Sequence, residues 1–170
     1  MNPFLSVVEA LNRHDVRYVI VGGFAAVMHG NDRTTVDLDI VVDLAPEEAR
    51  KPIAALLDLG MRSRVPVDPL LFADAAERGR WAREKQMMVF TMLDPKGILP
   101  DVDLFIEPPL AFGELFGRSE ILELENHATR VCSLDDLIDM KRRTGRPQDA
   151  LDVENLELLR SRRRAEGDSL

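Results

Sequence analysis

Two aspartates, Asp37 and Asp39, lie two positions apart in an otherwise apolar, largely β-branched run, Thr34-Thr35-Val36-Asp37-Leu38-Asp39-Ile40-Val41-Val42. Such a run predicts a buried strand. Alternation along a strand places both carboxylates on one face, roughly 6 to 7 Å apart, and sends Val36, Leu38 and Ile40 into a core. Like charges held together repel and lose solvation, and a multivalent cation neutralises them. The plainer alternative is a solvated strand edge.

A third acid, Asp103, lies between Val102 and Leu104 in another short apolar run. If its strand neighbours the first, the lateral gap to the acid pair is roughly 5 Å. Asp101 shares the face of Asp103 but follows Pro100 at the mouth of the strand, so Asp103 is the preferred ligand. Three converging carboxylates suit one or two Mg²⁺ ions. Two such ions, roughly 3.5 to 4 Å apart, stabilise the attacking and leaving oxygens of a phosphoryl displacement.

Gly22 and Gly23 follow a predicted strand at residues 17–21 and precede a short predicted helix at 24–29. Glycine lets the backbone approach a ligand closely, and a helix start offers free N–H groups to an anion. The pair therefore predicts a phosphate cradle, although a tight turn alone explains it too. It is neither a Walker loop nor a dinucleotide fingerprint. The three histidines are isolated, which argues against zinc.

The remaining pattern mixes helices and strands without strict alternation, which favours an α+β fold with a mixed sheet over a doubly wound parallel sheet. We expect helices over residues 3–14, 46–59, about 70–80, 133–143 and 149–160. We expect further strands over 86–93 and 102–106, and one or two within 121–132. The chain should form a single domain over residues 1–160, followed by a disordered tail at 161–170.

Composition limits the function classes. The net charge is −8 and the isoelectric point is near 4.9, which disfavours non-specific nucleic-acid binding. A lone cysteine, Cys132, cannot form an internal disulfide, so a reducing compartment is expected. The chain shows neither a leader pattern nor an apolar run long enough for a bilayer, which predicts a cytoplasmic protein without a membrane partner.

In combination these motifs resemble the signature of the DNA polymerase β-like nucleotidyltransferase superfamily. The resemblance is carried by Gly22-Gly23, by Asp37-Leu38-Asp39 and by Val102-Asp103-Leu104, in that order. The wider runs 22–39 and 137–152 are similar to small bacterial stand-alone nucleotidyltransferases, including toxin–antitoxin and abortive-infection members. The likeness spans roughly residues 17 to 159.

The resemblance implies a nucleotidyltransferase-like mixed sheet flanked by helices, with further helices at the C-terminus. It implies transfer of a nucleoside monophosphate from an NTP to a hydroxyl, with Mg²⁺ and the triphosphate held by Asp37 and Asp39. Asp103 corresponds to the acid that binds metal and activates the acceptor. The phosphate and nucleotide contacts that it implies are Gly22, Gly23, Arg33, Lys141, Asp149 and Asp152.

The acceptor stays open at this point: a protein, a tRNA or a small molecule. One alternative is a non-catalytic, antitoxin-like partner protein that retains the fold and works with a cognate protein. Another is an RNA-directed enzyme, which would need the arginines near residues 142–143 and 160–164 to gather on one face.

Overall fold

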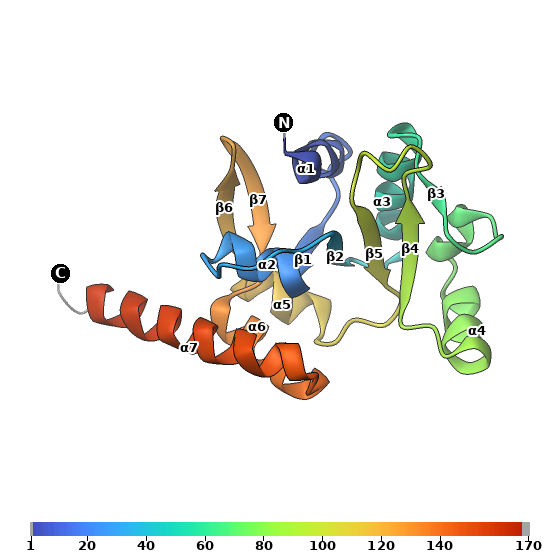
Figure 1. The fold of residues 1–170 in the computed structure, drawn as a ribbon. Coiled ribbons are helices and arrows are strands. Elements are labelled where there is room, and N and C mark those ends of the chain that lie inside the picture. Colours follow the sequence, from blue (N-terminus) through green and yellow to red (C-terminus); the bar gives the residue numbers. More distant parts are fainter. Residues whose placement is uncertain (1, 168–170) are drawn as a thin grey trace.

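A mixed β-sheet organises the computed structural model, which describes residues 2–167 (Figure 1). Within that range the sheet has seven strands in the order β3-β4-β5-β2-β1-β7-β6. The strands are β1 Tyr18–Val21, β2 Asp37–Val42, β3 Arg62–Ser63, β4 Val89–Leu93, β5 Asp101–Phe105, β6 Glu120–Leu124 and β7 His127–Val131. The β2–β5 and β1–β7 pairs are parallel and the others antiparallel. The predicted α+β fold with a mixed sheet is confirmed.

Helices flank this sheet and continue at the C-terminal end of the chain (Figure 1). Asn2 caps the first helix, where its side chain accepts a hydrogen bond from the Phe4 backbone. The Ser133 hydroxyl accepts one from the Asp136 backbone at the start of α6, and Gly145 ends that helix in the left-handed conformation. The helical elements are α1 Pro3–Arg13, α2 Gly22–Met28, α3 Pro46–Asp58, the 3₁₀ helix η1 Pro69–Ala73, α4 Ala75–Lys85, α5 Phe112–Arg118, α6 Leu134–Thr144 and α7 Pro147–Gly167.

The two central strands alternate as the sequence predicts. Leu38 and Ile40 on β2 are fully buried, as are Val102 and Leu104 on β5. Their intervening acids therefore point away from this core. The prediction was wrong for Val36, which precedes β2 and is 70% exposed, because the strand begins one residue later.

Several boundaries differ from the predicted ones. The two-residue strand β3 and the helix α5, which contains Gly113 and Gly117, were not predicted because neither carries a clear periodic signal. Residues 70–80 form η1 and then α4, separated at Asp74. Helix α7 continues past Arg160 to Gly167, into the predicted tail, whose residues 168–170 lie outside the described part. Over residues 2–167, every helix is too short or too polar for a bilayer span.

Candidate functional site

The predicted acids meet at the β2–β5 pair. Asp39 lies directly opposite Asp103 in the register of these parallel strands, and Asp37 lies opposite Asp101. All four positions share one face by alternation. Asp39 and Asp103 are half-buried, whereas Asp37 is exposed at the start of its strand. The structure therefore places the acids that the sequence analysis selected on one face of two adjacent strands.

Among these acids, Asp39 has a strongly raised pKa. Burial, and after it the neighbouring charges of Asp103 and Asp37, raise the pKa of its carboxyl from 3.8 to about 6. Arg146 and a hydrogen bond with the Gly23 backbone act in the opposite direction. Burial and the charges of Asp103 and Asp101 also raise the pKa of Asp37. A cation placed among these groups would relieve their repulsion.

The donor set matches the coordination habit of Mg²⁺. Within residues 2–167 no three His, Cys, Asp or Glu side chains form a preassembled metal cluster. Magnesium is commonly held by one or two carboxylates, with substrate phosphates and water supplying the remaining oxygens. The opposed pair Asp39 and Asp103, with Asp37 beside it, fits that mode.

The glycine turn is shaped by the Asp39 side chain. Gly22 has a φ of +67°, and a Cβ built on it would lie 2.2 Å from Asp39 Oδ2. A Cβ on Gly23 would lie 2.8 Å from Thr35 Oγ1. Both distances are far inside van der Waals contact, so these positions leave no space for a side chain. The turn thus lets the backbone between β1 and α2 lie against the acid pair.

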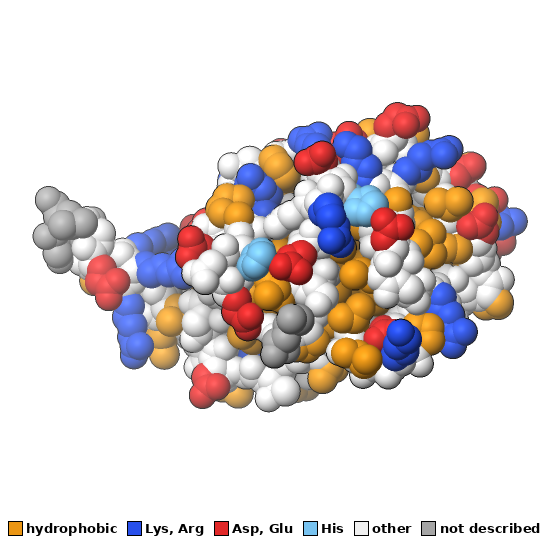
Figure 2. Space-filling model, turned by 90° about the horizontal axis from the view of Figure 1, so that it is seen from above, with side chains coloured by type: hydrophobic (Ala, Val, Ile, Leu, Met, Phe, Trp, Pro, Cys, Tyr) orange, Lys and Arg blue, Asp and Glu red, His pale blue; other side chains and the backbone are white. Residues whose placement is uncertain are grey.

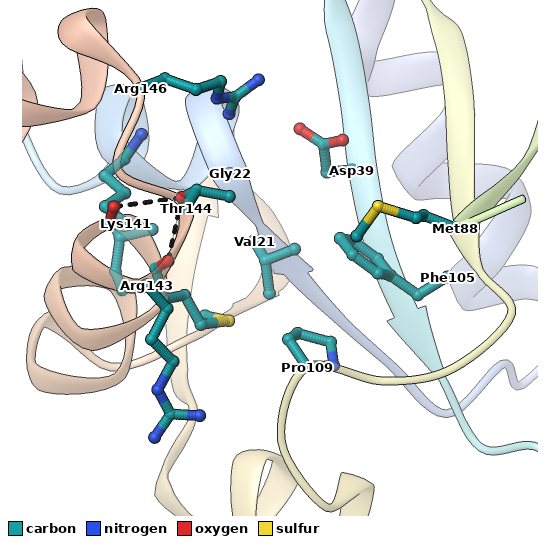
Figure 3. A pocket seen from close by; sticks show the side chains of 12 residues that line it. Val21, Gly22, Asp39, Met88, Phe105, Pro109, Lys141, Arg143, Thr144 and Arg146 are labelled. Carbon is teal, nitrogen blue, oxygen red and sulfur yellow. Dashed lines mark hydrogen bonds between the residues drawn. The ribbon is translucent and has the colours of Figure 1, made fainter. Parts of the chain in front are cut away.

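A cavity of about 300 Å³ opens between the acids and the C-terminal helices (Figure 3). One wall carries the cationic residues Lys141, Arg143 and Arg146. In Figure 3 the Arg146 side chain extends toward Asp39, whereas that of Arg143 points away from it. The other lining residues are mostly apolar or glycine: Val21, Gly22, Met88, Phe105, Pro109, Leu137, Met140 and Thr144. This arrangement can hold a polyanion with an apolar portion.

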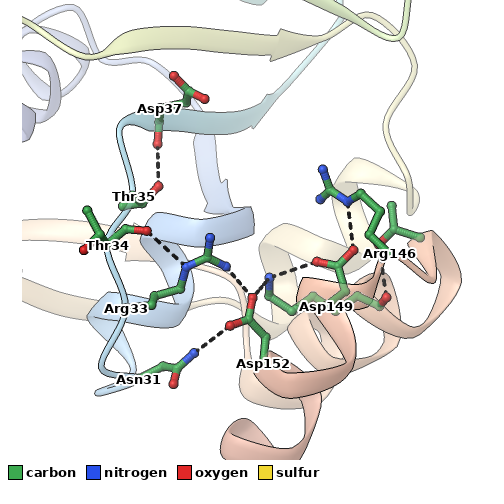
Figure 4. A network of polar contacts seen from close by, with 10 residues as sticks. Asn31, Arg33, Thr34, Thr35, Asp37, Arg146, Asp149 and Asp152 are labelled. Carbon is green, nitrogen blue, oxygen red and sulfur yellow. Dashed lines mark hydrogen bonds and ion pairs between the residues drawn. The ribbon is translucent and has the colours of Figure 1, made fainter.

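An ion-pair network holds Lys141 in that wall, and Figure 4 labels its partners Asp149 and Asp152. Its Nζ lies 2.8 Å from Asp152 Oδ2 and 3.6 Å from Asp149 Oδ1. Asp152 also accepts hydrogen bonds from Arg33 and, at 3.1 Å, from Asn31. Lys141, Asp149 and Asp152 are all buried. The two aspartates and Arg33 therefore position the lysine, while Lys141 itself lines the cavity.

Three groups were missed by sequence reasoning. Thr91 Oγ1 donates a 2.5 Å hydrogen bond to Asp103 Oδ1, across the β4–β5 pair. Arg146 lines the cavity and pairs with Asp149 at 2.9 Å, and Arg143 lines the cavity too. Arg146 lies inside the run 137–152 that resembles small bacterial nucleotidyltransferases. The sequence alone does not distinguish it from the other arginines nearby. Thr91 could be found only from strand register.

Several other charged side chains form ion pairs outside the acid pair and the cavity. Asp101 is paired with Arg64, which supports Asp103 as the ligand. The basic side chains that gather near the projecting end of α7 are largely matched by acids (Figure 2). Arg160 and Arg164 pair with Asp135, and Arg163 pairs with Glu120. The charges of these three arginines are therefore partly balanced, which weakens the case for RNA binding at this face.

No protein-family model and no curated protein sequence matches the chain. Several solved protein structures are similar to it. The lincosamide antibiotic adenylyltransferase LnuA, solved with lincomycin bound, is 14% identical with a TM-score of 0.61, over 92% of this chain and 96% of that one. ANT(2″)-Ia in complex with adenylyl-2″-tobramycin is 16% identical with a TM-score of 0.56, over 96% and 95%. An antigenic nucleotidyltransferase-like protein from Paracoccidioides brasiliensis is 16% identical with a TM-score of 0.55, over 92% and 74%. The fold of this chain is therefore the nucleotidyltransferase fold.

Proposed function

We propose that the protein is a Mg²⁺-dependent nucleotidyltransferase that moves a nucleoside monophosphate from an NTP to a hydroxyl. The observation that carries this proposal is the opposition of Asp39 and Asp103 at the edge of a cavity whose far wall is cationic. The nucleotidyltransferase fold supports it, and two of the similar structures are adenylyltransferases by name.

Substrate binding follows from the charges around the cavity. A triphosphate brings several negative charges, which Lys141, Arg143 and Arg146 can balance from one wall. Asp37, Asp39 and Asp103 would hold Mg²⁺, which supplies Lewis-acid polarisation of the phosphate oxygens. The Gly22-Gly23 turn lets the backbone lie against Asp39, beside the position proposed for the phosphates.

Asp103 is the group best placed to receive the acceptor proton. Thr91 holds its Oδ1, which orients the carboxylate and leaves Oδ2 for the acceptor hydroxyl. As that proton moves to Asp103, a bond forms between the acceptor oxygen and the α-phosphorus. The bond from the α-phosphorus to the bridging oxygen breaks, and pyrophosphate leaves with the electron pair.

The proposal also covers the acceptor of the nucleotide and a cognate protein partner. The hydroxyl acceptor is a protein, an RNA or a small molecule, and the antibiotic adenylyltransferases favour a small molecule. The small bacterial stand-alone type, with a toxin–antitoxin role and a cognate protein in the cytoplasm, agrees with the motifs of the sequence. Co-purification from the native cell tests for that cognate protein.

Label transfer tests the activity directly. The protein is incubated with Mg²⁺ and each α-³²P-labelled NTP together with small-molecule, RNA and protein acceptors. Wild type should transfer label, and Asp39→Asn and Asp103→Asn should each lower the rate at least 1,000-fold. Asp139→Asn, an exposed change on α6, is the matched control and should retain activity. Transfer that persists in both site variants would reject this site.

A thermal-shift experiment separates the enzyme from a non-catalytic partner protein. A ligand at 100 times its dissociation constant adds about 2.7 kcal/mol of stability. We expect an NTP with Mg²⁺ to raise the melting temperature of wild type but not of Asp39→Asn. No shift with any NTP would favour the antitoxin-like alternative.

A further inference from the structure

A second cavity, of about 450 Å³, lies at the other end of the acidic cluster, where β2 and β5 begin. Its lining includes Asp37 and Asp101 from the strand starts and Phe4 from α1. The remaining wall comes from the loop 97–100 and from Thr35 and Val36. Asp37 thus borders this space, while Asp39 borders the cationic cavity.

Two apolar side chains in this second cavity are exposed to an unusual degree. Val36 is 70% exposed and Ile98 is 68% exposed, and both line the same space. Isolated exposed aliphatic residues are common on protein surfaces. Two of them lining one cavity, beside the acids of a candidate active site, form an apolar wall that nothing in the described chain covers.

The two cavities have opposite charge. The cationic cavity carries Lys141, Arg143 and Arg146, whereas the described residues that line the second cavity include no lysine or arginine. Arg64 reaches Asp101 from outside the lining and balances that carboxylate. Among residues 2–167 no ion pair joins Asp37 to a cation, although the charge of Arg64 lowers the pKa of Asp37 from a distance. A polyanion therefore fits the first cavity, and a ligand without negative charge fits the second.

We propose that this second cavity, lined by Val36, Asp37 and Ile98, binds the acceptor, and that the acceptor is a small molecule whose hydroxyl is carried on an apolar body without negative charge. This inference rests on the proposed function. An in-line displacement needs the attacking and leaving oxygens on opposite sides of the phosphorus. Pyrophosphate leaves toward the cations of the first cavity, so the attacking hydroxyl must arrive from the opposite end of the acidic cluster, where this cavity lies.

The same chemistry argues against RNA as the acceptor. A strand of RNA brings a row of phosphates, which require Lys or Arg contacts along their path. At this cavity they would meet the Asp37 carboxylate and an aliphatic wall instead. RNA binding here is therefore an outcome that would overturn the proposal.

Isoleucine-methyl NMR tests occupancy without any reaction. The Ile98 methyl signal is assigned with Ile98→Val and followed in metal-free buffer. The probes share one apolar body: 3-phenylpropan-1-ol, 3-phenylpropylammonium and 3-phenylpropanoate. We expect saturable Ile98 shifts with the alcohol and the ammonium, and at least tenfold weaker binding of the carboxylate. The variants are followed on the proton signals of the probe itself, since Ile98→Lys lacks the Ile98 methyl group. Ile98→Lys should reverse that order, while Leu158→Lys, a comparable exposed aliphatic position on α7, should preserve it.

A paramagnetic measurement links the cavity to the acids. With Mn²⁺ and ATP added, the CH₂OH protons of the bound alcohol should relax faster than its ring protons, and Asp39→Asn should remove the effect. Equal relaxation at both ends would overturn the assignment as an acceptor site. So would an unmoved Ile98 signal, equal binding of the carboxylate, a shift with an RNA oligonucleotide, or a shift with protein concentration alone. The titration needs neither NTP nor catalysis, so its failure is distinguishable from failure of the label-transfer experiment.

Discussion

Gly22 lies so close to Asp39 that a single Cβ on the glycine would reach within 2.2 Å of the carboxylate oxygen Oδ2. The glycine also has a φ of +67°, which L-residues with side chains rarely adopt. Conformational strain and a steric clash therefore coincide at this one position. The clash falls on the group that would hold the metal.

Gly22→Ala should lower transfer activity at least 100-fold, because a displaced Asp39 no longer opposes Asp103. The stability loss should be about 1 to 2 kcal/mol from the unfavourable φ. Gly60→Ala is the matched control, because Gly60 has a φ of +81° but no atom within 4 Å of an added Cβ. Urea unfolding should show a loss from the unfavourable φ in both variants and a further loss from the clash in Gly22→Ala, and label transfer should show activity lost only in Gly22→Ala. Equal activity in both would contradict the role of this contact.

Asp39→Asn should stabilise the metal-free protein at pH 8. The folded-state pKa of Asp39, about 6, lies above its ordinary value of 3.8, so the folded protein binds this proton more tightly than the unfolded chain. Stability of wild type therefore falls as pH rises from about 4 through about 6. Removing the charge should recover roughly 2 to 3 kcal/mol at pH 8 and almost nothing at pH 4.

Urea unfolding across this pH range measures the Asp39 effect. At pH 8, adding Mg²⁺ with an NTP should stabilise wild type but not Asp39→Asn. The difference between their free energies of unfolding should therefore become smaller. A difference between wild type and variant that is the same at pH 4 and pH 8 would show that repulsion at Asp39 is not its cause.

Lys141→Met should destabilise the fold by roughly 2 to 3 kcal/mol, because each of two buried carboxylates loses one of its two cations. Arg146 stays beside Asp149 and Arg33 beside Asp152. Combining Lys141→Met with Asp152→Asn should cost less than the sum of the two single changes. Lys51→Met breaks a partly exposed pair with Glu48 and should change stability by less than about 1 kcal/mol. A double-mutant cycle by urea unfolding gives the coupling energy, and strict additivity would argue against a coupled network.

Thr91→Val removes the hydroxyl that orients Asp103 while preserving side-chain shape. We expect about a tenfold fall in kcat with an unchanged KM for the NTP, and about 1 kcal/mol of lost stability. Thr129→Val is the control, because the Thr129 hydroxyl donates to the backbone carbonyl of His127 and not to an acid of the site. This variant should lower stability without lowering kcat. A rise in KM alone in Thr91→Val would point to nucleotide binding instead.

Local pattern was sufficient to predict the acid-bearing strands. The alternation around Leu38 and Ile40 placed Asp37 and Asp39 on one face, and the structure agrees. The caps at Asn2 and Ser133 are local in the same sense, because capping depends on residues only two or three positions apart.

The rest depends on contacts between distant segments. That Asp39 faces Asp103 follows from which strands pair and in what register, and pairing on this scale is not a property of either run alone. The burial of Lys141 between Asp149 and Asp152 likewise depends on how α6 packs on α7. The apolar lining by Met88 and Phe105 carries no motif, because an aliphatic or aromatic residue in a core strand looks the same in sequence as one beside a cavity.

The parallel pairing of β2 with β5 has a consequence for synthesis of the chain. Neighbouring parallel strands cannot be joined by a tight turn, and here α3, β3, η1, α4 and β4 all intervene. The cationic wall arrives later still, with α6 and the start of α7. A nascent polypeptide therefore cannot bring the acid pair and the cationic wall together until α6 and the start of α7 have left the ribosome. Truncation before Lys141 should abolish the proposed transfer even where the sheet survives.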